Sequence, residues 1–237
     1  MSFLRASWEN LVLANYIIEP NILSPYIPKG TELDLWNGKC YVSLVGFLFK
    51  NTKLLGLKIP FHVNFEEVNL RFYVKRKENN KWKRGVVFIK ELVPKWALSF
   101  VANTIYKEHY QTVPMKNNIS INNEILNVSY KWKINNKWHS IEVNAEQECS
   151  LIEKESETEF ITEHYWGYAR VNDIRTNEYE VTHPRWVHHK IKDYKIKVDF
   201  EKVYGTEFSF LNNSKPNSVM LAKGSHITVG KRRKLSF

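Results

Sequence analysis

The sequence has few cysteines and no long apolar run. Cys40 and Cys149 lie far apart and in no CxxC arrangement, so the sequence predicts neither a zinc site nor a disulfide framework, and both side chains are expected to be buried thiols. No run approaches the roughly 18 apolar residues that span a bilayer, and the opening MSFLRASWENL has no basic region followed by an apolar core. These absences favour a soluble, cytoplasmic protein.

The common catalytic signatures are also missing. The sequence contains no GxGxxG, Walker A, GxSxG or HExxH motif, so it gives no support for a nucleotide-binding protein, a serine hydrolase or a zinc protease. His183, His188 and His189 form a string, but no acid or cysteine stands at a supporting interval, and a metal site needs three or four convergent ligands. We therefore expect no cofactor and no metal ion.

Acidic residues are fewer than basic residues in this sequence. The 35 lysines and arginines outnumber the 25 aspartates and glutamates, which gives a net charge of +10. Excess positive charge can indicate a nucleic-acid or membrane partner. Here the lysines are spread through turns and strand ends, only KRRK at 231–234 is a cluster, and no DNA-binding or RNA-binding signature accompanies the charge. A surface for nucleic acid or anionic lipid is therefore the least favoured function, and no membrane partner is expected.

What the chain does contain is a succession of short segments rich in aromatic and β-branched residues, separated by turn formers. Hydrophobic residues make up 43% of the sequence and aromatic residues 14%, which is enough for a substantial core. Such segments are typical of strands. Strands are expected at Trp8–Ile18, Gly38–Phe49, 65–76, Gly85–Leu92, Tyr165–Val171, Tyr179–His183, Tyr194–Tyr204 and Ser225–Val229, with a meander over 120–144.

Three short helices are expected between these strands. The first begins at Pro20 and ends before Pro28. The second is an amphipathic helix that begins at Pro94 and ends near Lys107. The third covers Glu157 to His164, where Ser156 and Glu159 form the S-x-x-E pattern of a capping box.

This order of elements predicts one α+β domain that is mainly β. About ten strands and three helices favour a curved, barrel-like antiparallel sheet with few helices. We expect a single domain over residues 1–230 and a loose basic tail at 231–237. The sequence leaves the oligomeric state open.

One strand has two chemically different faces. In the segment FEEVNLRFYV, at 65–74, alternation puts the apolar side chains Val68, Leu70, Phe72 and Val74 on one side. Glu67, Asn69 and Arg71 share the other side, where an acid, an amide and a guanidinium are able to form a connected network. This face points to solvent, as in an ordinary surface strand, lines a cavity or forms a buried polar network that supports the sheet, and the sequence leaves all three open.

The arrangement of these segments resembles the uncharacterised bacterial DUF2071 proteins, also called the YqjF-like family, which are similar in fold to acetoacetate decarboxylase. The segment E-x-N-x-R-x-Y-V is the most specific part of the resemblance. The matching residues are WENLVLANYIIEPNILSPYIPKGTELDLWNGKCYVSLVGF at 8–47, FEEVNLRFYV, GVVFIKEL with its following helix, FITEHYWGY and HPRW.

The resemblance implies a barrel-like fold that encloses a pocket. In acetoacetate decarboxylase the pocket holds a lysine that forms a Schiff base with a β-keto acid, and glutamates and an arginine orient the carboxylate. It places Glu67 among the pocket glutamates and makes Lys107, after the second helix, the nearest candidate for the lysine. His109 and Tyr110 follow on a loop that is able to deliver them to the mouth of the pocket.

These observations favour a small-molecule pocket protein with an anionic organic ligand. Arg71 is the natural partner of a carboxylate, because its planar fork forms two parallel hydrogen bonds. Asn69, His109 and Tyr110 are the other candidate ligand contacts, and Glu67 and Lys107 the candidate catalytic groups. Decarboxylase-like or other lyase chemistry is one possibility, and a non-catalytic binding or sensing domain that uses the same pocket is the main alternative.

Overall fold

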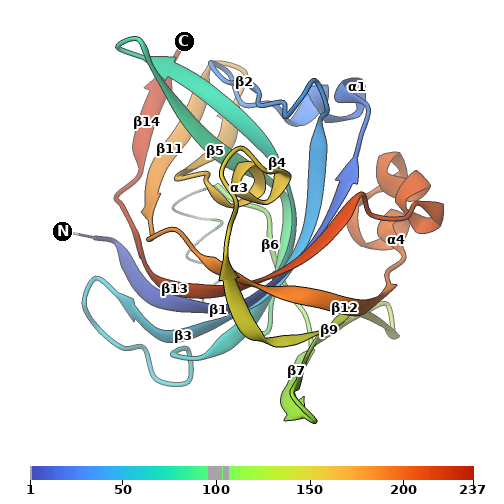
Figure 1. Cartoon of the computed structure of the whole chain (residues 1–237). Helices are drawn as coiled ribbons and strands as arrows, with labels where there is room; N and C mark the ends of the chain where they lie inside the picture. Colours follow the sequence, from blue (N-terminus) through green and yellow to red (C-terminus); the bar gives the residue numbers. More distant parts are fainter. Residues whose placement is uncertain (1, 96–102, 104–106) are drawn as a thin grey trace.

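The computed structural model describes residues 2–95, 103 and 107–237. In this part of the chain, fourteen strands join one sheet, and short helices lie at its margins (Figure 1). The predicted fold class, mainly β with a few short helices, is confirmed. The amphipathic helix predicted between Pro94 and Lys107 falls mainly on residues 96–102 and 104–106, and that prediction lies outside the described residues.

Five of the strands are long. β1, β3, β4, β5 and β9 each run for 13 to 15 residues. The strands are β1 (Leu4–Ile17), β2 (Glu32–Leu33), β3 (Tyr41–Leu54), β4 (Phe65–Glu78), β5 (Lys81–Val93), β6 (Tyr110–Thr112), β7 (Met115–Asn122), β8 (Ile125–Ile134), β9 (Lys137–Leu151), β10 (Trp166–Asn172), β11 (Arg175–Thr182), β12 (Val187–Lys197), β13 (Ser218–Val229) and β14 (Arg233–Ser236).

The sheet closes on itself. The strand order is β14, β11, β10, β5, β4, β3, β1, β13, β12, β9, β8 and β7, and β11 also pairs with β13. Val181 and Thr182 of β11 face Val229 and Thr228 of β13. These pairs close a ring that runs from β11 through β10, β5, β4, β3 and β1 to β13 (Figure 1). The remaining strands β12, β9, β8 and β7 continue from the ring.

The two faces of β4 pack in different environments. Val68, Leu70, Phe72 and Val74 belong to a large apolar cluster that also contains side chains of β8 and β9, so the meander covers the outer face of the ring. The opposite side chains of β4 face the inside of the ring, where a second apolar cluster includes Phe65 and Tyr73 together with residues of β1, β3 and β5. The alternation predicted for this strand is thus what the structure has.

The predicted capping box is confirmed. Ser156 Oγ accepts a hydrogen bond from Glu159 N at 3.1 Å and begins the helix α3 (Glu157–Thr162). The helix ends at Thr162 and not at His164, which leaves His164 in irregular chain directly before β10. The other short helices are α1 (Pro20–Leu23), η1 (Ser24–Tyr26), α4 (Phe200–Tyr204) and η2 (Thr206–Asn213).

The expectation of one strand from Tyr194 to Tyr204 is wrong. β12 ends at Lys197, and Asp199 then begins the helix α4 by accepting a hydrogen bond from Lys202 N at 3.2 Å. Phe200, Val203 and Tyr204 are buried on one face of this helix. An aspartate followed by apolar residues at helical spacing is an ordinary start signal, and it prevails here over the strand propensity of the surrounding tyrosines.

The expectation of two buried thiols holds for one cysteine only. Cys40 is buried, and burial raises the pKa of its thiol to about 11. Cys149 is exposed on β9, and its Sγ lies 3.3 Å from Nε2 of the cross-strand residue His189.

The basic C-terminal segment is an ordered part of the sheet, so the expectation of a loose tail is wrong. Its residues form β14, which pairs with β11. Arg233 of β14 lies 2.5 Å from Glu78 and 2.6 Å from Glu178. Glu178 is buried and also pairs with Arg76 at 2.8 Å. A buried carboxylate needs cationic partners, and one of these comes from the last strand of the chain.

Among the described residues, no helix has the length and apolar character needed to cross a bilayer.

Candidate functional site

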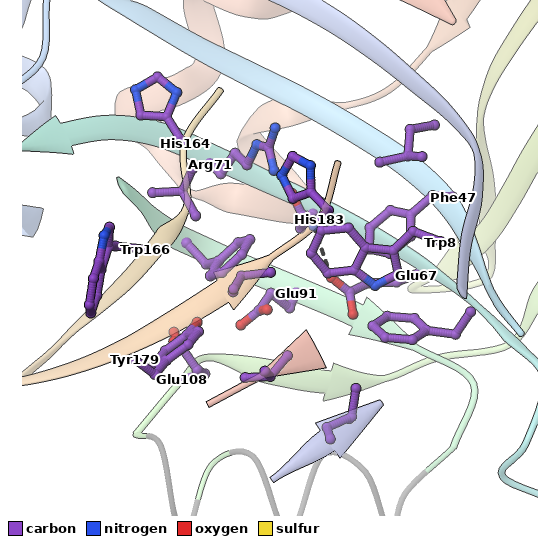
Figure 2. A pocket seen from close by; sticks show the side chains of 18 of the residues that line it. Trp8, Phe47, Glu67, Arg71, Glu91, Glu108, His164, Trp166, Tyr179 and His183 are labelled. Carbon is purple, nitrogen blue, oxygen red and sulfur yellow. Dashed lines mark hydrogen bonds between the residues drawn. The ribbon is translucent and has the colours of Figure 1, made fainter. Parts of the chain in front are cut away.

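A cavity of about 140 Å³ lies on the inner side of the ring. Its walls come from β1, β3, β4, β5, β10, β11 and the segment before β6, so residues far apart in the sequence meet there (Figure 2). Apolar and aromatic side chains form most of the walls, and a smaller number of polar side chains point between them. This composition is typical of small-molecule sites.

The polar face of β4 contributes three of the lining residues. Glu67, Asn69 and Arg71 all line the cavity, and all are at least nine-tenths buried. Asn69 Nδ2 donates a hydrogen bond to Glu67 Oε1 at 2.9 Å, and Tyr110 OH donates to Glu67 Oε2 at 3.1 Å. The guanidinium of Arg71 lies 5.7 Å from the centre of the Tyr73 ring, a cation–π arrangement. The strand therefore places an acid, an amide and a guanidinium side by side in one cavity.

A β-bulge in β5 brings a second glutamate into the cavity. In the pairing of β4 with β5, Leu70 faces Lys90 and Arg71 faces Phe88, so Ile89 has no partner of its own. Such an extra residue reverses the alternation of the strand beyond it. Phe88 and Glu91 consequently both line the cavity. Lys90 points away from it, and its Nζ donates to the carbonyl of Val203.

Three buried glutamates share the cavity. Burial raises the pKa of Glu67 to about 7, although the hydrogen bonds from Asn69 and Tyr110 oppose this shift. Burial also raises the pKa of Glu108 to about 8, and Tyr179 OH donates to Glu108 Oε1 at 2.7 Å. Burial and the neighbouring carboxylates raise the pKa of Glu91 well above its usual value. Carboxyl groups so close together favour their protonated forms near neutral pH.

A hydrogen bond between His164 and Asp34 connects the cavity to the cleft on the other side of its wall. His164 lines the cavity, and its Nε2 lies 3.1 Å from Asp34 Oδ2. Asp34 lies in an open cleft on the other side of the wall, where Arg84 Nε donates to the same oxygen at 2.6 Å. Burial favours the neutral acid, but the hydrogen bonds from His164 and Arg84 outweigh it and lower the pKa of Asp34. Burial lowers the pKa of His164 to about 4, so its ring is neutral at pH 7.

Several buried polar atoms at this site have no hydrogen-bond partner among the described residues. They are Trp8 Nε1, Asn69 Oδ1, Arg71 Nε, Glu91 Oε2 and His164 Nδ1. All five residues line the same cavity. Unsatisfied buried polar atoms are rare in folded proteins, because each costs about 1–3 kcal/mol. Their concentration in one cavity makes this cavity the candidate functional site.

Aromatic side chains form the apolar part of the wall. Trp8 packs edge-on against Phe47 with ring centres 5.2 Å apart, and against Trp186 at 6.2 Å. Phe49 stacks on Phe65 at 4.6 Å. All of these residues line the cavity. Such rings exclude water and strengthen the electrostatic interactions of the polar groups beside them.

Not all of the residues predicted from the sequence meet at this cavity. Tyr110 lines it and contacts Glu67. Lys107 and His109 are exposed and are not among the described residues that line it. His109 contributes only its carbonyl, which accepts a hydrogen bond from Glu91 N at 3.0 Å. The roles assigned to Lys107 and His109 remain predictions.

The histidines of the string at 183–189 lie in separate places. His183 lines the cavity and stacks on Trp186 with ring centres 4.2 Å apart. His189 contacts Cys149 on the neighbouring strand β9, and His188 lies between them in sequence on the other face of β12. Within the described residues, no cluster of three or more potential metal ligands occurs.

Sequence reasoning missed Glu91, Glu108 and His164. Strict alternation in GVVFIKEL puts Lys90 on the same face as Phe88 and assigns Glu91 to the opposite face. Glu108 follows a segment without a clear strand pattern. His164 lies in the connection between α3 and β10, and connections usually run over the surface, so no local pattern indicated that it is buried.

The fold is similar to that of solved structures of the acetoacetate decarboxylase type. Acetoacetate decarboxylase from Legionella pneumophila gives a TM-score of 0.66 at 10% sequence identity, over 98% of this chain and 87% of that chain. An acetoacetate decarboxylase-like enzyme from Sphingomonas wittichii gives 0.67 at 9% identity, over 100% and 94%. The enduracididine biosynthesis enzyme MppR, solved with the condensation product of pyruvate and imidazole 4-carboxaldehyde, gives 0.66 at 11% identity, over 98% and 89%. The chain therefore has an acetoacetate decarboxylase-like fold.

Sequence comparison shows the family. Residues 5–226 match the model of DUF2071, described as an uncharacterized conserved protein, and the chain belongs to this family. The uncharacterized protein YqjF of Bacillus subtilis is 33% identical over 86 residues, which are 36% of this chain and 34% of YqjF. The match to this curated relative thus spans about a third of its length. The family resemblance seen in the sequence is confirmed.

Proposed function

We propose that this protein binds a small organic acid in the cavity inside the ring, with the ligand carboxylate held by Arg71. The observation that carries the proposal is the buried Arg71 Nε: Arg71 lines the cavity, and this atom has no hydrogen-bond partner in the part of the chain that the structure describes. A guanidinium buried without a carboxylate partner is costly. A ligand carboxylate supplies both the charge and the hydrogen-bond acceptors that Arg71 lacks.

The charges of the surrounding residues support an anionic ligand. The raised pKa values of Glu67, Glu91 and Glu108 reduce the negative charge of the cavity near pH 7, where Glu67, with a pKa of about 7, is about half protonated. Arg71 then provides the positive charge among the polar groups of β4, and neutral carboxyl groups are able to donate hydrogen bonds to a bound carboxylate. Three ionised glutamates would instead repel the same ligand.

The volume limits the size of the ligand. A cavity of about 140 Å³ is comparable with engineered cavities of about 150 Å³ that accommodate benzene. An acid of about six non-hydrogen atoms, such as lactate or pyruvate, fits a cavity of this volume. The names of the fold neighbours agree with this class, because one is an acetoacetate decarboxylase and another, MppR, was solved with pyruvate.

Isothermal titration calorimetry with lactate and pyruvate tests the proposal. We expect saturable binding of at least one of these acids to the wild-type protein, and a loss of about tenfold or more in affinity for Arg71→Gln, because a charged hydrogen bond in a buried site is removed. Arg175→Gln is the matched control: it makes the same change in charge at an exposed residue of β11. Binding by neither acid, or equal binding by the Arg71 variant and the wild type, would refute the proposal.

A further inference from the structure

The hydrogen-bonding role of His164 in the cavity is fixed by its partner in the wall. Asp34 is a carboxylate whose lowered pKa keeps it ionised, so it only accepts hydrogen bonds. His164 Nε2, 3.1 Å away, must therefore carry the proton and donate it. A neutral imidazole with a proton on Nε2 has a bare lone pair on Nδ1. Inside the cavity, His164 is thus an acceptor.

Asn69 is an acceptor in the cavity for a similar reason. Its Nδ2 group donates to Glu67 Oε1 at 2.9 Å, which directs its Oδ1 away from Glu67. Asn69 Oδ1 and His164 Nδ1 are both buried and have no hydrogen-bond partner within residues 2–95, 103 and 107–237, and the two residues are at least nine-tenths buried. The cavity therefore presents two fixed acceptors that need hydrogen-bond donors.

Arg71 gives the cavity a donor close to these acceptors. Its Nε–H group has no partner among the residues that the structure describes, and its charge contributes to the low pKa of His164, behind the larger effects of burial and of the Arg84 charge. Figure 2 shows Arg71 and His164 at the same end of the cavity, with Glu91, Glu108 and Tyr179 toward the other end. A ligand that satisfies this end must accept hydrogen bonds at Arg71 and donate one nearby.

We propose that the ligand is a small hydroxy acid, whose carboxylate contacts Arg71 and whose neighbouring hydroxyl donates to His164 Nδ1. This inference rests on the proposed binding of an organic acid and adds a preference within that class. An oxo acid of the same size has only acceptors at the corresponding position. Its carbonyl oxygen would face the lone pair of His164, and both groups would remain unpaired. Sites built to hydrogen-bond a hydroxyl reject analogues that lack it.

The comparison of lactate with pyruvate tests the preference directly. Calorimetry on the wild-type protein with each enantiomer of lactate, with pyruvate and with acetate requires no variant. We expect one lactate enantiomer to bind about tenfold or more tightly than pyruvate. Pyruvate binding that equals or exceeds both enantiomers would refute the preference while leaving the proposed function standing. Binding by none of these acids would refute the proposed function itself, and the preference with it.

The assignment of His164 has its own test. His164→Phe keeps a flat ring in the wall but removes the acceptor, so the preference for lactate over pyruvate should shrink to within about threefold. His226→Phe, at an exposed histidine of β13, is the matched control and should retain the wild-type ratio. An unchanged ratio in a folded His164 variant would refute the assignment. Nitrogen NMR of the wild type provides a second measurement, since a proton on Nδ1 in place of Nε2 would also refute it.

Discussion

At the scale of single residues, burial determines the protonation of the site. The pKa of Glu67 is about 7 in the folded protein, against 4.5 for an ordinary glutamate. Between these values the folded protein holds a proton that the unfolded chain has released. The free energy of unfolding therefore falls as the pH rises from about 4.5 to about 7, because ionising Glu67 costs more free energy in the folded protein than in the unfolded chain.

Replacing Glu67 by glutamine should remove this loss of stability at high pH. Glu67→Gln stays neutral at every pH and keeps an oxygen for Asn69 Nδ2. We expect urea unfolding to show similar stabilities for the variant and the wild type at about pH 4.5, and a variant more stable by about 1–3 kcal/mol at about pH 8.5. Glu148→Gln, at an exposed residue of β9, should change stability by less than about 0.5 kcal/mol at either pH. A Glu67 variant that is less stable at both pH values would contradict a neutral Glu67.

Single residues were also where the sequence was most and least informative. Glu67, Asn69 and Arg71 were predicted because strand alternation is a local rule. In a strand with one apolar face, the remaining side chains share the opposite face. Glu108 and His164 join them because β6 and β10, which follow these residues, both pair with β5, and no local pattern encodes these long-range pairings. Asp34 is still further from the site in sequence, and only the structure shows that it fixes the role of His164.

At the scale of elements, the bulge in β5 decides which charged side chain enters the cavity. Without it, Lys90 would follow Phe88 inward and Glu91 would face the outer cluster. A bulge has little signature in sequence, since Ile89 fits a regular strand as well as a bulged one. The strand itself was predicted from its composition. Composition does not predict which side chains after the bulge face the cavity.

The bulge leads to a prediction about Schiff-base chemistry. Such chemistry requires a lysine amine beside the bound carbonyl, but Lys90 points away from the cavity and Lys107 is exposed. Treatment with pyruvate and borohydride, followed by peptide mass analysis, should give no more adduct on these two lysines than on an exposed control such as Lys39. A stoichiometric adduct on Lys107 would instead support the decarboxylase-like role implied by the family resemblance, and one on Lys90 would contradict the bulge.

At the scale of the whole molecule, the cavity exists because strands from both ends of the chain close the ring. β1 and β13 pair along most of their length, and β11 reaches β13 through Val181 and Thr182. β14 pairs with β11, and its residue Arg233 forms an ion pair with the buried Glu178. The composition of the segments predicted a curved sheet, and the family resemblance implied a pocket, but the order of the strands and the ordered C-terminal strand depend on long-range pairing.

The central claim is that the inward-facing polar atoms of β4 bind a small acid inside this ring. The most direct test is a crystal structure of the wild-type protein soaked with lactate. We predict density for the ligand in the cavity, with a carboxylate oxygen within hydrogen-bond distance of the Arg71 guanidinium and the hydroxyl near His164 Nδ1. Lactate found only on the outer surface, with Arg71 turned out of the cavity toward solvent, would contradict the account.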